Sequence, residues 1–367
     1  MHTKIIALLV AALLIGNYSF GNIFRVGYTG PPLAGVDYAD LQSAQDAASA
    51  GDTLQVYTNI TTHGNIDKKL VIIGYGYNFD ANANLQVIGT DAPSSADITF
   101  SPGSDGSMVS GISGSFGIGD YAGTGIPISN ITFQRCNGDF RFYNFIGYSI
   151  NYGTISNIQI SGSVINLRLS YHGTDGTPVN NLQIYNCIVQ LIQLFKANTT
   201  AIIENCVSAS LTYSSFSFLD LNDASVLMKN CIFASSNSMN NINTIYENNF
   251  FAEAQPVVLP AGSNNRWSQD WAVIFNRLGG TSDAPGYYAD PSFDEDYYVL
   301  KAGSPAINAG LDAANNPSDA GIYGGETAYI YKLSGVPAVP ANYKLTAPST
   351  VASSNPYNIT ISVRSNN

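Results

Sequence analysis

The sequence predicts an all-β protein built as a single parallel β-helix, a solenoid with a short N-terminal capping helix and an extended C-terminal tail. Three observations support this fold class. A short segment recurs at irregular intervals, its residues alternate between apolar and polar types, and only 11% of all residues are charged. Ordinary soluble domains have about a quarter of their residues charged, so uncharged polar side chains must cover much of this surface.

The recurring segment is the main observation. Six copies align without gaps, and the intervals between their last residues are 27, 24, 19, 25 and 18 residues. Loops of variable length around one recurring strand are typical of a solenoid and exclude most repeats of fixed period. The copies are NITFQRC (130–136), NIQISGS (157–163), NLQIYNC (181–187), TAIIENC (200–206), SVLMKNC (225–231) and NTIYENN (243–249).

Alternation within each copy indicates which way the side chains point. The residues five and three positions before the last one are mostly apolar, as at Leu182 and Ile184, and the positions between them are mostly polar. Each copy is therefore a strand with one buried face. The last residue shares the inward parity, which predicts a buried column on successive coils, formed by Cys136, Ser163, Cys187, Cys206, Cys231 and Asn249.

Asparagine stands directly before this column in four of the six copies, at Asn186, Asn205, Asn230 and Asn248. Asparagine tolerates left-handed backbone angles better than most residues. A single left-handed residue turns the chain sharply, so we predict a one-residue bend at these positions. The amides of successive bends are expected to stack along the solenoid axis.

The column also bears on the four cysteines. Four cysteines in an exported chain would ordinarily suggest two disulfides, but a buried thiol also behaves as a small hydrophobe. A Cys187–Cys206 bond is conceivable because neighbouring strands lie about 4.8 Å apart, yet parallel side-chain directions disfavour it. We expect four free, buried thiols.

Two flanking segments complete the pattern. Residues 38–57 are typical of a capping helix, a glycine stop at Gly51 and a first strand, and residues 296–310 with 319–325 resemble a closing coil. Together with the asparagine bends, these features resemble the pectin-lyase-like superfamily of right-handed parallel β-helices. The resemblance spans roughly residues 38–325 and implies a right-handed coil. It implies no particular activity, because this fold hosts many.

The chain is expected to divide into four parts. Residues 1–21 are interpreted as a secretory signal peptide, because a short apolar run follows Lys4 and small residues lie at the expected cleavage point. A cap region over 22–52, the β-helix over 53–325 and a proline-punctuated tail over 326–367 follow. We expect an exported protein, secreted or at the cell surface, without a membrane-spanning segment.

Charge and metal-ligand spacing limit the partners. The net charge of −11 argues against nucleic acid and anionic membranes, both of which require a basic patch. No cofactor is expected, because no spacing of His, Cys, Asp or Glu matches a transition-metal site. The acidic run Asp290, Asp294, Glu295 and Asp296 could bind calcium. It lacks the regular loop of known calcium sites. The flanking segments resemble bacterial ones, and we expect a monomer.

One polar cluster is distinguished by its register. Arg141 and Arg168 each lie five residues after the column, so they are expected to stack on the outer face of neighbouring coils. Asp139 and Asn166 lie two positions earlier in the same units, and Gln190 follows in the next coil.

The loop beyond the second arginine adds further polar groups to this cluster, at Tyr171, His172 and Asp175. The candidates for ligand binding are Arg141, Asn166, Arg168, Tyr171 and Gln190. The weaker candidates for catalysis are Asp139, Arg141, Arg168, His172 and Asp175. A purely structural interpretation is also open, in which Asp139 neutralises two like-charged guanidinium groups on a solvated polar ladder.

Two functional hypotheses follow. The first is a non-catalytic secreted or surface protein that presents an uncharged polar wall to a glycan or to another protein. The alternative is a polysaccharide lyase or glycoside hydrolase that uses the polar cluster. The first is favoured because the middle coils have few titratable groups and the usual catalytic motifs of these enzymes, such as paired Asp-Asp with a Gly-His-Gly nearby, are missing.

A second polar row lies two residues before the column. If the coils stack in sequence order, Lys229 sits between Glu204 and Glu247, with Tyr185 next in the row. Opposed charges on neighbouring strands contribute roughly 0.2–1 kcal/mol. We expect this exposed row to aid solubility and register, and Lys229 not to be a catalytic base.

Overall fold

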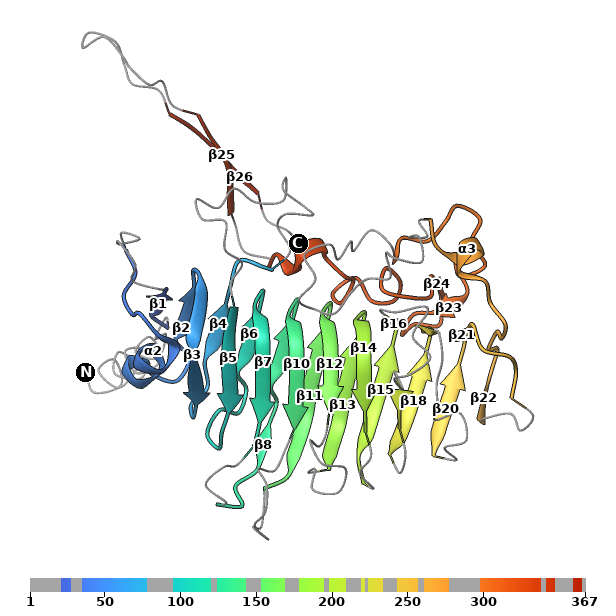
Figure 1. Cartoon of the computed structure of the whole chain (residues 1–367), viewed down its shortest axis with the longest axis horizontal. Coiled ribbons are helices and arrows are strands. Elements are labelled where there is room, and N and C mark those ends of the chain that lie inside the picture. The colour runs from blue at the N-terminus through green and yellow to red at the C-terminus, as the bar shows by residue number, and fades with distance from the viewer. Residues whose placement is uncertain are drawn as a thin grey trace, which may run out of the picture.

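The strands of the computed structural model gather into two long parallel sheets (Figure 1). The structure describes residues 21–27, 35–77, 95–119, 124–142, 153–168, 178–194, 198–208, 219–221, 224–233, 243–256, 261–276, 298–337, 341–346 and 359–364. The predicted signal peptide lies almost wholly outside the described residues.

Neighbouring strands in each sheet follow the order of the coils. Sheet A contains β1 (Ile23–Val26), β2 (Thr53–Val56), β4 (Val71–Ile73), β6 (Met108–Ser110), β9 (Thr132–Gln134), β11 (Ile155–Ser161), β13 (Val179–Tyr185), β15 (Thr200–Glu204), β18 (Ser225–Lys229), β20 (Thr244–Glu247) and β22 (Ala261–Ser263), with β8 (Ile128–Ser129) beside β11. Sheet B contains, in reverse, β21 (Phe250–Phe251), β19 (Ile232–Phe233), β16 (Val207–Ser208), β14 (Ile188–Gln193), β12 (Val164–Arg168), β10 (Asn137–Phe142), β7 (Ser113–Ile118), β5 (Ser95–Phe100) and β3 (Asn59–Ile66), with β17 (Leu219–Asp220) beside β14.

The chain passes from a strand of sheet A through a short bend to a strand of sheet B, and we call this unit a coil. Each strand pairs in parallel with the equivalent strand of the next coil, as β11 does with β13 and β12 with β14. Apolar side chains from both sheets fill one continuous core. In it, the rings of Phe133 and Phe140 pack edge to face with their centroids 5.1 Å apart. This all-β arrangement is compatible with the predicted β-helix-like solenoid.

Helix α2 (Leu41–Ala47) covers the N-terminal end of the core, as expected (Figure 1). Asp40 caps it by accepting a hydrogen bond from the Ser43 N–H at 2.8 Å. The helix ends at Ala47 with Ala48 as its C-cap, whereas Gly51 takes a φ of 96° in the turn before β2. Within the described residues, no helix is long and apolar enough to span a membrane.

The predicted column is confirmed, since all six of its side chains are fully buried. The thiols of Cys136, Cys187, Cys206 and Cys231 are free. Burial raises the pKa of the Cys136 thiol to about 12, so this thiol keeps its proton and donates to a backbone carbonyl.

Hydrogen bonds along the column explain why its residues are Cys, Ser and Asn. The backbone N–H of each column cysteine donates to the column side chain of the next coil, as from Cys187 to Cys206 Sγ at 3.5 Å and from Cys206 to Cys231 Sγ at 3.4 Å. Each thiol in turn donates to the carbonyl two residues before it, as Cys206 does to Glu204. A column residue must therefore be small and must both donate and accept.

The predicted bends are also confirmed. Asn186, Asn205, Asn230 and Asn248 all take φ values between 51° and 56°. The equivalent positions in the two earlier units, Arg135 and Gly162, have a φ of 55°. The left-handed bend is thus kept even where the residue is not asparagine.

Stacking of the bend amides is confirmed only in part. Asn230 Nδ2 lies 3.3 Å from Asn205 Oδ1, but most bonds from these amides go elsewhere. A more continuous amide ladder, which the sequence reasoning missed, runs through the exposed left-handed residues Asn130, Asn157 and Asn181. Its two links measure 3.2 and 2.9 Å. Each of these asparagines is the first residue of an aligned segment, and this shared position could have predicted the ladder.

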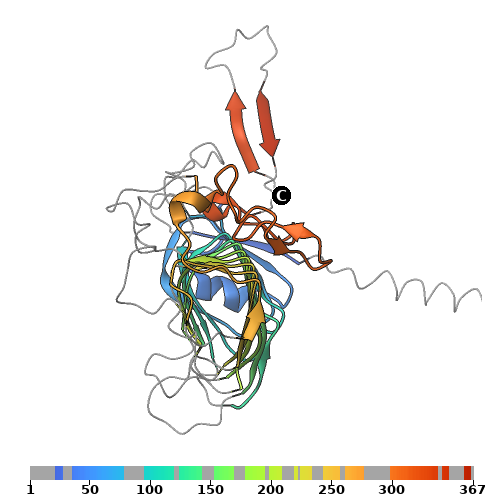
Figure 2. The same ribbon diagram turned by 90° about the vertical axis from the view of Figure 1, so that its right-hand side faces the viewer.

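The bend amides hold a segment that we call the strap, residues 310–337. Asn186 Nδ2 donates to the carbonyls of Ile322 and Gly324 at 2.9 and 2.7 Å. Asn205 Nδ2 donates to the carbonyls of Asp319 and Gly321 at 3.1 and 3.3 Å. The strap therefore runs back along the bends, from later coils toward earlier ones (Figures 1 and 2).

The expected closing coil is thus wrong. Residues 298–325 add no strand to sheet A or sheet B; β23 (Gly310–Leu311) and β24 (Pro317–Ser318) pair only with each other. Glycine lets the strap lie flush, because a Cβ at Gly324 would come 2.7 Å from the Asn205 amide nitrogen. An outward apolar row formed by Val164, Ile188, Val207, Ile232 and Phe250 follows the bends and packs in one cluster with Ala320, Ile322 and Tyr331 of the strap.

Other elements lie beyond the two sheets. Helix α3 (Trp271–Ile274) follows the last coil, and the 3₁₀ turn η2 (Leu333–Gly335) belongs to the strap. Strands β25 (Ala341–Thr346) and β26 (Thr360–Arg364) form an antiparallel hairpin that projects from the solenoid (Figure 2).

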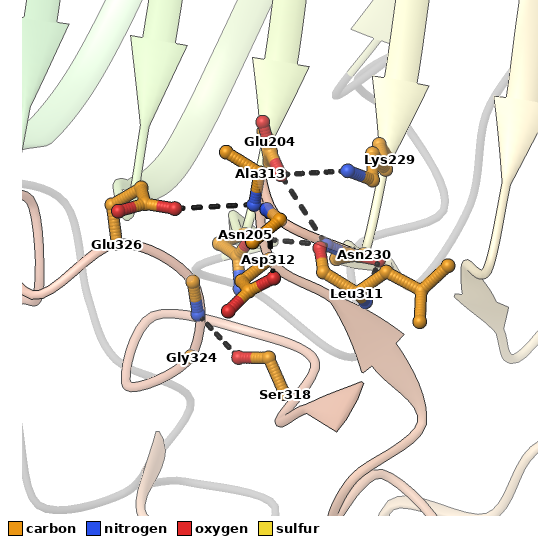
Figure 3. Close-up of polar contacts among 12 residues, drawn as sticks. Glu204, Asn205, Lys229, Asn230, Leu311, Asp312, Ala313, Ser318, Gly324 and Glu326 are labelled. Atoms are coloured by element: carbon orange, nitrogen blue, oxygen red, sulfur yellow. Dashed lines mark hydrogen bonds and ion pairs between the residues drawn. The ribbon is translucent and has the colours of Figure 1, made fainter. Parts of the chain in front are cut away.

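The register of the second polar row is confirmed, with Lys229 between Glu204 and Glu247 and its Nζ 3.3 Å from Glu204 Oε1. Its expected exposure is wrong. The side chains of Lys229 and Glu204 are only 16% and 22% exposed, and the strap lies beside them (Figure 3).

The column hydrogen bonds give a first prediction. Replacing Cys206 with Ala leaves the Cys187 N–H without its acceptor, and an unsatisfied buried donor costs about 1–3 kcal/mol. We expect Cys206→Ala to lower the free energy of unfolding by about 2 kcal/mol in chemical denaturation. Cys206→Ser keeps a donor and an acceptor and should lose less. Equal stability of the alanine variant and the wild type would contradict the role of the column.

Candidate functional site

The predicted polar cluster forms on the outer face of sheet B. Asp139 of β10 pairs in register with Asn166 of β12, and Arg141 pairs with Arg168. The alternation therefore correctly predicted both rows. Asp139 and Asn166 are each only 8% exposed. We call Asn137, Asp139, Arg141, Asn166 and Arg168 the polar patch.

The two arginines have different partners. Arg141 Nη2 lies 2.6 Å from Asp139 Oδ2 within the same strand. This ion pair matches half of the structural interpretation, in which Asp139 neutralises the arginines. It leaves the second arginine, Arg168, without a carboxylate partner among the described residues. The patch therefore has a net charge of +1 from its three ionised side chains.

Several polar atoms of the patch are buried and have no hydrogen-bond partner. They are Asn137 Oδ1, Asp139 Oδ1, Asn166 Oδ1, Arg168 Nε and, in the neighbouring strand β14, Gln190 Nε2. Buried polar groups in native proteins are nearly always paired, because each unpaired one costs about 1–3 kcal/mol. A concentration of such atoms on one face makes the polar patch the candidate site of this structure.

Asn137 was missed by the sequence reasoning. It lies two residues before Asp139 on the same outward parity, which was a usable signal. Asn137 immediately follows the column residue Cys136. At the same position, the later units have the apolar residues of the outward row.

The expected position of Gln190 is wrong. The β12–β14 register shifts after Ile165, so that Leu191 pairs with Asn166 and Gln193 with Arg168. Gln190 is the extra residue of this irregularity, which counting from the column could not detect. Its amide nitrogen is nevertheless buried and unpartnered.

The remaining candidates, Tyr171, His172 and Asp175, lie outside the described residues, as does the acidic run 290–296. Within the part of the chain that the structure describes, no group of three or more His, Cys, Asp or Glu side chains is arranged to hold a metal ion.

A second carboxylate lies on the same face. Asp97 of β5 accepts a hydrogen bond from the Ser115 N–H of β7 at 3.0 Å, and Ser115 pairs with Asp139. Two strand spacings, about 10 Å, therefore separate the backbones that bear the two carboxylates. The corresponding range between the carboxyl groups of inverting glycosidases is about 6.5–9.5 Å, and the Asp97 carboxylate reaches toward β7, the strand between β5 and β10.

The strap borders the polar patch. Val164 lies two residues before Asn166 and packs in the same cluster as Tyr331 of the strap and Tyr77. The two tyrosine hydroxyls lie 3.0 Å apart. Movement of the strap would therefore change one side of the patch.

Comparison with protein-family models finds no match for this chain, and comparison with curated proteins finds none either.

The unpartnered atoms give a second prediction. Asn166→Leu removes a buried amide oxygen that lacks a donor, so we expect the free energy of unfolding to be unchanged or raised by up to about 1 kcal/mol. Asn205→Leu is the matched control. It removes two bonds to the strap and places leucine at a φ of 55°, so it should cost about 2 kcal/mol or more. Both values come from chemical denaturation. Similar losses in the two variants would show that Asn166 has a structural role.

Proposed function

We propose that this chain is an exported right-handed β-helix of the pectin-lyase-like type that binds a saccharide at the polar patch without transforming it. The buried, unpartnered polar atoms of the patch are the observation that supports this proposal.

The unpartnered atoms favour a ligand that carries hydroxyl groups. Asp139 Oδ1 needs a donor and Arg168 Nε needs an acceptor. The amides of Asn137, Asn166 and Gln190 supply either kind of atom, because a rotated amide exchanges oxygen and nitrogen. A hydroxyl both donates and accepts, so neighbouring hydroxyls of one sugar ring complement such a mixed set.

General rules support the finer parts of the proposal. Connections between parallel strands of one sheet are right-handed in nearly all proteins, which favours a right-handed solenoid. The apolar run after Lys4 favours export. The one-residue bends and inward column favour the pectin-lyase-like type, and we infer that the chain acts as a monomer.

The alternative is a glycoside hydrolase or lyase. Asp97 and Asp139 on one face of sheet B are the observation that favours it. Binding is preferred because the Asp139 carboxylate is engaged by Arg141.

A glycan panel with neutral and uronate-containing oligosaccharides tests this proposal. We expect at least one saccharide to bind, and Arg168→Ala to weaken its binding about tenfold or more, because hydrogen bonds to charged groups contribute roughly 1.5–3 kcal/mol. Asp139→Ala should weaken binding similarly. Arg25→Ala is the control, since Arg25 pairs with Asp37 near the N-terminal end of the solenoid.

The same samples distinguish binding from turnover. New reducing ends or an unsaturated product, lost in Arg168→Ala or Asp139→Ala, would favour the enzymatic alternative. No binding across the panel, or equal affinity of Arg168→Ala and the wild type, would contradict a saccharide site at this patch.

A further inference from the structure

Several carboxylates crowd the place where the strap meets the bends. Glu204 of β15 and Glu247 of β20 flank Lys229 on the solenoid side. The strap brings Asp312 and Glu326 to the same place (Figure 3). Four carboxylates therefore surround one lysine among the residues described at this junction.

Glu204 is the carboxylate most closely linked to strap binding. Its Oε1 lies 3.3 Å from Lys229 Nζ and accepts a hydrogen bond from Asn230 Nδ2 at 3.4 Å. Asn230 in turn holds the strap, because Nδ2 donates to the Leu311 carbonyl at 2.8 Å and Oδ1 accepts from the Leu311 N–H at 3.2 Å. The Asn230 carbonyl also accepts from the Gly321 N–H at 2.9 Å.

We propose that the strap is a pH-sensitive latch, which docks on the bends more tightly at mildly acidic pH than at neutral pH because carboxylates outnumber cations at the junction.

Several titratable or charged groups act on Glu204 in the docked state. Those of the solenoid are Tyr185, Cys206, Lys229 and, beyond the lysine, Glu247; those of the strap are Glu326, Tyr329 and, through the lysine, Asp312. Only Lys229 opposes the negative charge. Protonation of Glu204 would leave this lysine to Asp312 and Glu247 and would remove repulsion from Glu326.

The direction of the pKa shift agrees with this geometry. Burial raises the pKa of Glu204 above its ordinary value of 4.5, Lys229 partly opposes the change, and the charge of Glu326 adds to it. A carboxyl whose pKa is raised by docking prefers the docked state when protonated. Docking therefore weakens as pH rises from about 4.5 through the raised pKa, and does not change further above it.

Opening of the strap would uncover side chains of the outward apolar row, among them Val207 and Ile232 beneath Gly321, and the row adjoins the polar patch at Val164. The latch would thus couple pH to the shape of one side of the patch. The pH response itself does not depend on whether the patch binds a saccharide.

Hydrogen exchange on the full-length protein tests the latch. The Leu311 and Gly321 amides report strap opening, and the Ile232 amide, which bonds to the Cys206 carbonyl, reports the solenoid. After correction for intrinsic exchange, we expect the strap amides to be more protected at pH 5 than at pH 7.5. Because pH 5 already lies above the ordinary glutamate pKa of 4.5, only part of the response falls between the two pH values, and we expect the protection to differ by about two- to threefold. The solenoid amide should change less.

Variants assign the response to Glu204. Glu204→Gln should abolish the pH dependence, whereas Asp46→Asn, at an exposed carboxylate on α2, should retain it. Glu326→Gln changes an exposed strap residue and should shift the midpoint to lower pH, so it tests the proposal even if Glu204→Gln does not fold. Equal protection of the wild-type strap at the two pH values would overturn the latch. An unchanged pH response in Glu204→Gln or an unshifted midpoint in Glu326→Gln would also overturn it.

Discussion

The rest of the structure depends on one backbone constraint at the bend between the two sheets. The N–H of a bend residue donates forward to the next coil, as from Asn205 to Lys229, whereas the N–H two residues later donates back, as from Val207 to Cys187. The N–H group between these two belongs to a column residue, and no carbonyl of a neighbouring strand accepts a hydrogen bond from it. Because this group is fully buried, a side chain must accept its hydrogen bond.

This constraint explains the composition of the column. Ser163 and Asn249 serve the same role as the thiols, since each accepts from the column N–H of the preceding coil, at Cys136 and Cys231 respectively. A valine there would fill the space but would leave a donor unpaired. Cysteine satisfies the donor while keeping an apolar interior, so the four cysteines need no disulfide to explain them.

The same bend has a second consequence on its outer side. A left-handed asparagine turns the chain and also presents an amide that its own coil does not fully use. The strap supplies backbone carbonyls to these amides, and its glycines permit the close approach. Asparagine therefore serves both the fold of each coil and the attachment of a distant segment, which is why the amide stack is interrupted.

The parts of the fold that follow from strand periodicity could be predicted from the sequence. Alternation placed the column and the pairs Asp139–Asn166 and Arg141–Arg168, and the asparagines before the column marked the bends. It failed at Gln190, because one inserted residue changes a register without changing the composition of the strand.

The strap could not be predicted for a related reason. Its contacts join residues more than a hundred positions apart, such as Asn186 and Ile322, and they use its backbone carbonyls. Backbone carbonyls leave no trace in side-chain patterns. The glycines near residue 324 were visible, but they fit a closing turn as well as a segment lying flush against another surface.

The buried polar groups at the bends have hydrogen-bond partners, and this makes the unpartnered polar atoms of the polar patch more informative. Where the fold alone sets the requirement, this chain meets it with a suitable side chain: a thiol, a hydroxyl or an amide on coil after coil. On the outer face of sheet B, an apolar residue at Asn166 would be the simpler structural choice, as at its partner Leu191. Retaining unpartnered polar atoms there, on Asp139, on Arg168 and on the amides, lowers the stability of the protein. Such a cost is common at binding sites, so the contrast between column and patch supports the proposed functional face.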